Sequence, residues 1–209
     1  MTIAIVANEA QKTEILSCKT VPKEVMLHFV DKPANEDFSD YDAAFFLDTK
    51  VSGLEDLRSF NIPVIINSVT DTLRELELPF NFSRINGWDG FLGRNIYEIV
   101  SNDFSLSRKI FEMLQWQAIE VKDEPGLIAA RVISMIINEA YFALQDNLSS
   151  EEEIDVAMKY GTNYPLGPFE WIEKIGTVKV YSLLQKLSIT DNRYEVAPLL
   201  LKRIPVSDR

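Results

Sequence analysis

The chain has 209 residues, of which 46% are hydrophobic, and a formal net charge of -11 at pH 7. This length fits one large domain or two modest ones, and the hydrophobic content is enough for a real core. The negative charge argues against nucleic-acid binding and against anionic membrane surfaces as partners, because both require clustered Lys and Arg.

The cysteine content and the apolar runs indicate the cellular compartment that we expect for the protein. The single cysteine, Cys18, excludes an internal disulfide framework and fits a reducing cytoplasm. The first six residues lack the basic start and long apolar run of a signal peptide. The longest apolar stretch, residues 127–144, contains Arg131 and Glu139, so we interpret it as a buried helix rather than a membrane span. We therefore expect a cytoplasmic protein that does not bind membranes.

Short apolar runs alternate with polar connections in the first half of the chain. Their β-branched content is typical of strands buried in a parallel sheet, and helical spacing separates some of them. This alternation predicts a doubly wound α/β layer, a Rossmann-like fold with a mainly parallel sheet. We expect strands at residues 3–6, 25–30, 43–47, 64–66, 82–88, 96–100 and 118–121, and helices at 54–60 and 104–114.

The pattern changes after Glu124, where Pro125 and Gly126 interrupt it. A helix of about twenty residues follows, apolar on nearly every face, so it requires neighbours on several sides. Ser150 before three glutamates predicts the N-cap of the next helix. Further helices are expected at residues 151–160, from 168, at 177–187 and at 196–203. We thus predict an α/β domain at 1–123 and an all-helical domain at 124–209.

The helical half carries several motifs of one known family. They are Pro125-Gly126, Asn138-Glu139-Ala140, residues 154–158 (IDVAM), residues 164–170 (YPLGPFE) and residues 191–194 (DNRY). Together they resemble the C-terminal domain of the 3-hydroxyacyl-CoA dehydrogenase (3-hydroxybutyryl-CoA dehydrogenase) family. In relatives, this region forms the dimer interface and one wall of the acyl-CoA cleft. The resemblance therefore implies a homodimer through the C-terminal helices, and an acyl-CoA or other acyl ligand.

The first half resembles the family's NAD-binding domain in outline only and is shortened. Glycines after the first strand let backbone amides approach the pyrophosphate, but Ala7 to Gln11 follow it here, and the chain contains no GxGxxG. Glu9 would place a carboxylate near the phosphates. Asp31 stands where relatives keep an acid for the ribose hydroxyls, and without the glycine loop we interpret it as a turn residue. We expect a degenerate Rossmann-like domain with no bound cofactor, although the family uses NAD.

The catalytic motif of the family is also altered. Relatives use a histidine base in a Gly-Leu-His-Phe-Phe-Asn-Pro stretch, oriented by a glutamate on the next strand. The base position aligns with Asp89 and the glutamate with Glu98, while Ala130 and Asp71 replace an expected asparagine and serine. A carboxylate is a weak base unless a like charge raises its pKa. Asp89 and Glu98 are thus either a paired-carboxylate site or a solvated face.

Two further features have ordinary structural interpretations. His28, the only histidine, lies inside the second strand, where a core or sheet-face residue is expected rather than a base. One histidine and one cysteine exclude a zinc cluster within one chain. The three glycines of residues 87–93, followed by Arg94, match either a phosphate cradle or a tight turn between strands, and we favour the turn.

Three functions are compatible with these patterns. The first is an active, divergent NAD-dependent 3-hydroxyacyl-CoA dehydrogenase. The second, which we prefer, is a relative in fatty-acid metabolism whose dehydrogenase activity is lost or strongly impaired and which binds an acyl ligand. The third is a non-enzymatic dimeric interaction module that docks through the connections at residues 36–42 and 73–79.

Overall fold

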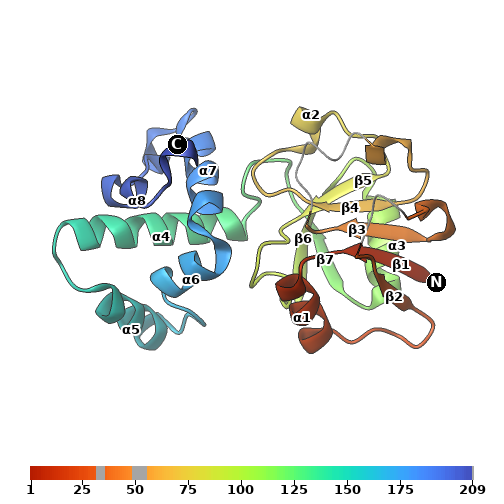
Figure 1. The fold of residues 1–209 in the computed structure, drawn as a ribbon, viewed down its shortest axis with the longest axis horizontal. Helices are drawn as coiled ribbons and strands as arrows, with labels where there is room; N and C mark the ends of the chain where they lie inside the picture. The colour runs from red at the N-terminus through yellow and green to blue at the C-terminus, as the bar shows by residue number, and fades with distance from the viewer. Residues whose placement is uncertain (32–35, 49–55, 209) are drawn as a thin grey trace. The chain divides into compact units, whose positions relative to one another are not determined.

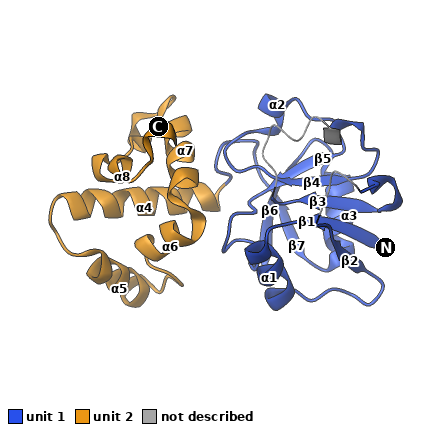
Figure 2. Ribbon diagram, in the orientation of Figure 1, with its two compact units in different colours: residues 1–127 blue, residues 128–209 orange. Residues whose placement is uncertain are grey.

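A computed structural model describes residues 1–31, 36–48 and 56–208. The chain divides into two compact units, Met1–Leu127 and Ile128–Arg209 (Figure 2). The sequence-based boundary lay between residues 123 and 124. Within the described ranges, no helix has the length and apolar character needed to cross a membrane.

Unit 1 is built on a seven-stranded sheet in the order β2-β1-β3-β4-β5-β6-β7 (Figure 1). Every neighbouring pair is parallel except β5 and β6, which run antiparallel. The mainly parallel Rossmann-like sheet is therefore confirmed. The strands are β1 (Thr2–Val6), β2 (Met26–Phe29), β3 (Ala43–Phe46), β4 (Val64–Asn67), β5 (Phe82–Ile85), β6 (Ile96–Ser101) and β7 (Gln117–Glu120).

Two of the helical elements of unit 1 differ from expectation. The sequence did not indicate α1 (Glu9–Cys18), because its only buried residues are Gln11 and Ile15, which leaves no apolar stripe. Of the helix expected at 54–60, residues 54 and 55 lie outside the described residues, and η4 (Asp56–Ser59) is a 3₁₀ turn. The other elements are α2 (Leu73–Leu76), α3 (Phe104–Leu114) and the 3₁₀ turn η2 (Phe38–Asp40).

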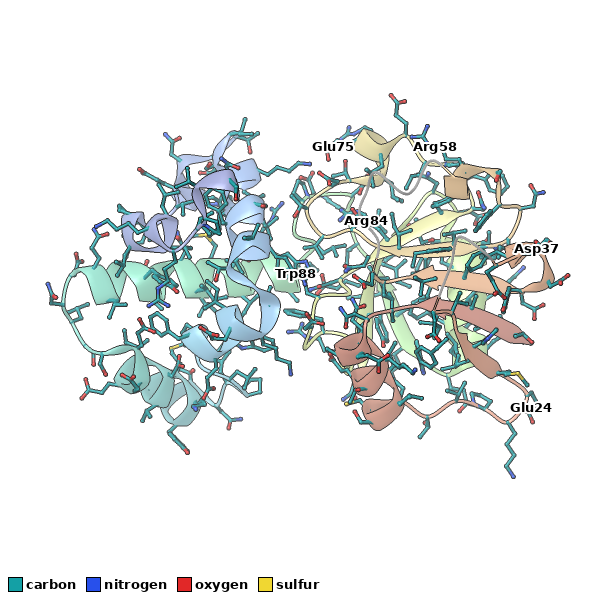
Figure 3. The ribbon with its side chains drawn as sticks, viewed as in Figure 1. Glu24, Asp37, Arg58, Glu75, Arg84 and Trp88 are labelled. Carbon is teal, nitrogen blue, oxygen red and sulfur yellow. The ribbon has the colours of Figure 1, made fainter. Side chains whose placement is uncertain are left out.

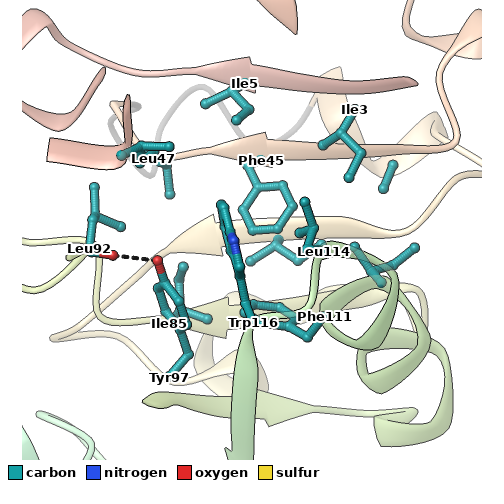
Figure 4. Packing of buried hydrophobic residues seen from close by; sticks show 14 of the residues in the cluster. Ile3, Ile5, Phe45, Leu47, Ile85, Leu92, Tyr97, Phe111, Leu114 and Trp116 are labelled. Carbon is teal, nitrogen blue, oxygen red and sulfur yellow. Dashed lines mark hydrogen bonds between the residues drawn. The ribbon is translucent and has the colours of Figure 1, made fainter. Parts of the chain in front are cut away.

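Each face of the sheet has its own hydrophobic core. Because successive strand residues point to opposite faces, Ile3 and Ile5 pack with α1 and α3 on one side, around Trp116 (Figure 4). Ala4 and Val6 face the other core, which η2 and α2 help to cover. Burial on both faces explains why these strands appear in the sequence as continuous apolar runs.

The second core includes part of two segments that were expected to be exposed connections. In residues 73–79, Leu73 and Leu78 are only 2% and 7% exposed and pack in this core, whereas the charged residues between them are exposed. The segment at residues 36–42 likewise buries Phe38 and Tyr41 and exposes its aspartates. Both segments therefore bury two apolar side chains each and expose most of their charged residues.

The buried Arg84 fastens the end of unit 1 to the sheet (Figure 3). Its Nε donates to Asp123 at 2.8 Å, Nη1 to the Ser68 carbonyl at 2.9 Å and Nη2 to the Glu124 carbonyl at 2.7 Å. Burial lowers the pKa of Arg84, and the charge of Asp123 opposes that shift. Asp123 in turn accepts from the first two amides of α2. The connecting segment is thus an integral part of unit 1, not a loose linker.

Unit 2 is all-helical, as predicted. Its longest helix packs against three others of the unit, but one side of it is half-exposed; Val132, for example, is 51% exposed. Ser150 caps the second helix, as expected, and that helix runs past Gly161. The helices are α4 (Ala129–Gln145), α5 (Glu151–Thr162), α6 (Pro168–Ile175), α7 (Thr177–Ser188) and α8 (Pro198–Lys202).

Two polar residues of the unit 2 motifs hold helices in place. Asn138 is 2% exposed; its Oδ1 accepts from the Ala197 amide at 2.9 Å, and its Nδ2 donates to the Glu195 carbonyl at 2.8 Å. The carboxylate of Asp155 accepts from the amides of Phe169 at 2.9 Å and Glu170 at 3.1 Å, at the start of α6. These bonds satisfy backbone groups that would otherwise be buried without partners. Both motif residues therefore support the fold.

A substitution at Gly167 tests how closely α5 and α6 pack at this point. A Cβ at this position would lie 2.2 Å from Cγ of Asp155, so Gly167→Ala must push Asp155 away from the start of α6. We expect a loss of about 1–3 kcal/mol in the free energy of unfolding from overpacking alone. Gly161→Ala is the matched control, because it meets no atom within 4 Å on α5 and should stabilise by about 0.5–1 kcal/mol. Thermal unfolding of both variants measures the difference; equal melting temperatures would contradict it.

Candidate functional site

The carboxyl ends of β1 and β3 mark the place where an open α/β sheet binds ligands. The chain leaves β1 towards β2 on one side and returns to β3 on the other, which makes this the switch point of the sheet. In dinucleotide-binding proteins the pyrophosphate lies here, against the N-terminus of the first helix. We therefore describe what occupies this position.

The side chain of Gln11 fills the switch point. It is 2% exposed, and its Nε2 donates to the Leu47 carbonyl at 3.0 Å and to the Gly87 carbonyl at 2.9 Å. Asn67 adds a parallel link, because its Nδ2 donates to the Leu47 carbonyl at 3.0 Å and its Oδ1 accepts from the Gly87 amide at 2.9 Å. Gln11 thus ties the residues after β3 and β5 to α1, and Asn67 ties both of them to the end of β4.

The start of α1 is also capped by its own side chains. Asn8 Oδ1 accepts from the Gln11 amide at 2.9 Å, and Gln11 Oε1 accepts from the Asn8 amide at 3.0 Å, a capping box. Glu9 follows in the first turn with its side chain 87% exposed, so a carboxylate already lies at the positive end of the helix. Asp31, the ribose candidate, lies exposed just beyond β2.

The glycine-rich segment after β5 is a turn, as favoured from the sequence. Its amides do hold an anion, but that anion is Glu14 of α1. Gly90 donates to Glu14 Oε2 at 2.8 Å and Gly93 to Oε1 at 2.7 Å. Lys19 adds a hydrogen bond to the Arg94 carbonyl. These two amides are therefore engaged by the protein itself.

The strand register shows which residue lies opposite Glu98 on the neighbouring strand. Asp89 is half-buried in the turn, and Glu98 is half-buried on β6. Ile85 pairs with Ile99 in the antiparallel β5–β6 pair, so the next residue along, Asn86, lies opposite Glu98. Asn86 is the site residue that sequence reasoning missed. Counting back from Glu98 along an antiparallel pair would have found it.

Asn86 lines a small polar cavity. It is 7% exposed, its Oδ1 accepts from the Trp88 amide at 3.1 Å, and its Nδ2 has no hydrogen-bond partner among the described residues. Burial lowers the pKa of Arg94, another lining residue, and the charges of Glu98 and Glu14 partly oppose that shift. The cavity measures about 10 Å³ and is lined by Asn86, Phe91, Arg94, Ile96, Tyr97 and Glu98.

The remaining sequence candidates lie elsewhere. Ala130 is fully buried in α4, and Asp71 is half-buried before α2, where its carbonyl accepts from Ser68. His28 is on the exposed side of β2, and its Nδ1 contacts the Tyr41 hydroxyl. Burial and Glu36, to which that hydroxyl donates, raise the pKa of Tyr41 to about 12. In the described part of the chain, no group of three His, Cys, Asp or Glu residues is placed to hold a metal ion.

The double hydrogen bond of Gln11 can be tested by substitution. Gln11→Leu keeps the approximate volume but leaves the Leu47 and Gly87 carbonyls without this donor, so we expect a loss of about 1–3 kcal/mol in the free energy of unfolding. Thr13→Ala, on an exposed position of the same helix, should change it by no more than about 0.5 kcal/mol. Urea unfolding of the two variants provides the measurement. If Gln11→Leu is as stable as the wild type, the bonds do not close the switch point.

Known proteins share the helical unit most clearly. Residues 126–206 match the family model for "3-hydroxyacyl-CoA dehydrogenase, C-terminal domain". Over 107 residues, the chain is 39% identical to 3-hydroxyadipyl-CoA dehydrogenase of Escherichia coli (strain K12), covering 49% of this chain and 22% of that protein. Over 103 residues, it is 34% identical to 3-hydroxybutyryl-CoA dehydrogenase of Bradyrhizobium diazoefficiens, covering 48% and 35%. Residues 126–206 thus carry the C-terminal domain of the 3-hydroxyacyl-CoA dehydrogenase family. Its matches span only about a fifth to a third of these curated relatives.

Solved structures extend the likeness in fold to both units. The (S)-3-hydroxybutyryl-CoA dehydrogenase from Ralstonia eutropha matches with a TM-score of 0.71 over 96% of this chain and 92% of that one, at 17% identity. The 3-hydroxybutyryl-CoA dehydrogenase from Escherichia coli K12 matches 66% of this chain and 31% of that one, with a TM-score of 0.56 and 32% identity. At 17% identity the likeness concerns the fold alone, so the state of the site must be judged from this chain's own residues.

Proposed function

We propose that this member of the 3-hydroxyacyl-CoA dehydrogenase family has lost, or nearly lost, NAD-dependent dehydrogenase activity and binds an acyl-CoA or another acyl ligand. The observation that carries the proposal is the Gln11 side chain at the switch point. A role in fatty-acid metabolism and a cytoplasmic location belong to the same proposal; the lone Cys18 fits a reducing compartment.

Cofactor binding is opposed by several groups at once. A pyrophosphate at the start of α1 would have to displace Gln11, which costs about 1–3 kcal/mol at the Gly87 carbonyl, while the Leu47 carbonyl keeps Asn67 as a donor. It would then meet the carboxylate of Glu9 at the same helix start. Asp31 alone offers a ribose contact but no phosphate site. We therefore expect no bound NAD, although the family's dehydrogenases use it.

Proton transfer is opposed in the same way. By the family resemblance, the base is an imidazole beside a glutamate, but the residue opposite Glu98 is Asn86, whose amide has no basic site near neutral pH. Asp89, three residues further into the turn, is the alternative base, and as a carboxylate it requires a raised pKa to accept a proton from a hydroxyl group. A paired-carboxylate reaction of Asp89 with Glu98 therefore stays the weaker hypothesis.

Ligand titration separates the impaired relative from an active dehydrogenase. We expect the protein to cause no change in NADH fluorescence, even at millimolar cofactor concentrations, because Gln11 occupies the switch point. For the same reason, NAD should not raise the melting temperature. Acyl-CoA should raise the melting temperature, since a ligand that binds only the folded state stabilises it. An active family dehydrogenase measured in parallel is the control. Saturable NADH binding would contradict the proposal and favour the active, divergent dehydrogenase.

We also propose a homodimer through the helices of unit 2. A groove of about 750 Å³ runs along the half-exposed side of α4 and is almost entirely apolar. Exposed apolar surface of this kind marks interaction sites, and a two-fold dimer brings the same patch of two copies together. The groove is lined by Arg131, Val132, Met135, Ile136, Glu139, Ala140, Ala143, Ile154, Met158, Pro168, Arg193 and Tyr194.

A charge introduced in the groove tests the dimer. Val132→Asp should shift the protein from dimer to monomer, because a carboxylate buried in an apolar interface loses its hydration. Ile189→Asp is the matched control: Ile189 is 81% exposed in the same unit but does not line the groove, so its variant should stay dimeric. Analytical ultracentrifugation measures both masses. A monomeric wild type at micromolar concentration contradicts the proposal directly.

A further inference from the structure

The outer edge of strand β7 is open. β7 is the last strand of the seven-stranded sheet and, among the described residues, pairs only with β6. The Val121 amide donates to the Ile99 carbonyl at 2.9 Å, so alternate residues of β7 direct their backbone groups at β6. The N–H and C=O groups of Ala118 and Glu120 therefore point outward. A row of such groups is a template for pairing with another extended chain.

A groove lies beside this edge. It has a volume of about 670 Å³ and is lined by all four residues of β7 and by residues of α3, which packs against that strand. Phe111 and Trp116 supply buried apolar wall from the core on this side of the sheet (Figure 4). Ala118 packs against the same core, so a strand residue placed opposite it would direct its side chain to the α3 side. The groove is therefore positioned to receive an apolar side chain of an added strand.

The charges beside the edge favour a basic chain. Arg108 and Glu112 of α3 pair with each other, with 2.7 Å between Nε and Oε1. Glu120 is exposed and makes no ion pair with a described residue. A lysine or arginine opposite Glu120 gains from the cross-strand charge pair, whereas an acidic residue there is destabilising. The net charge of -11 also attracts a basic segment.

A second copy of this chain fits the edge poorly. Antiparallel pairing of two β7 strands would place Glu120 opposite either Ala118 or Glu120 of the second copy. The two Glu120 carboxylates would then be diagonal or direct neighbours, and like charges in such positions repel. The charge pattern thus favours a different chain over self-pairing.

We propose that the β7 edge binds an extended, basic segment of another protein as an additional antiparallel strand. The incoming residue opposite Glu120 is Lys or Arg. The residue two positions later lies opposite Ala118, because the added strand runs against β7, and its apolar side chain enters the groove. The surface shares no residue with the switch point or with the groove on α4, so the inference does not depend on the proposed acyl ligand or dimer.

Fluorescence anisotropy of the full chain with two labelled peptides tests the inference. The probe is Thr-Thr-Lys-Thr-Leu-Thr-Thr, with fluorescein at its N-terminus and an amidated C-terminus, and the matched peptide has Glu in place of Lys. We expect saturable binding of the lysine peptide, about fivefold tighter than that of the glutamate peptide, the size of one charge pair across strands. No saturable binding of the lysine peptide, or equal affinity for both, would overturn the inference.

Methylation of the peptide backbone tests whether the peptide is added as a strand. N-methylation of the leucine removes the N–H that would bond the Ala118 carbonyl, and it should weaken binding about fivefold. N-methylation of the threonine before it is the matched control, because that N–H points away from β7 in an antiparallel pair. Equal losses from the two methyl groups would contradict strand pairing.

Variants of the protein locate the contact. Glu120→Lys should reverse the preference, so that the glutamate peptide binds more tightly. Glu24→Lys, the same change at an exposed position before β2, is the control and should keep the wild-type preference. An unchanged preference in Glu120→Lys would overturn the inference. So would a dimer that persists in Val132→Asp and dissociates once Ala118→Pro is added, because it would place a second copy at this edge.

Discussion

The pair of hydrogen bonds from Gln11 to the Leu47 and Gly87 carbonyls holds α1 against the carboxyl ends of the strands, and the proposed function depends on it. A switch point binds dinucleotides only when the first turn leaves backbone amides open to a phosphate. Here one amide side chain caps the helix and ties it to the turn after β5. The same residue stabilises the fold and stands where the proposed loss of cofactor binding would be decided.

The turn after β5 is also held by a side chain of α1. Glu14, one helical turn beyond Gln11, places its carboxylate on the Gly90 and Gly93 amides. Side chains of α1 thus occupy both neighbouring positions that would suit an anion, the start of α1 and the amides of this turn. Asn86, at the start of this turn, keeps a buried amide nitrogen without a hydrogen-bond partner among the described residues.

The motifs of unit 2 have a different explanation from those of unit 1. Asn138 and Asp155, prominent in the family resemblance, bind backbone groups at helix ends rather than a ligand. Gly167 belongs with them, because any side chain there would collide with Asp155. These motifs identify the family through its architecture. In the other unit, the resemblance to solved structures is one of fold alone.

The sequence by itself determined the two-part organisation, the strands and nearly all helices of the second half, because apolar periodicity and capping residues act locally. It missed α1, whose buried side is an amide and one isoleucine. Only the tertiary structure decided that Gln11 fills the switch point and that Asn86 faces Glu98. Both depend on contacts between residues that are far apart in the chain, and neither strand register nor a long-range hydrogen bond leaves a local pattern in the sequence.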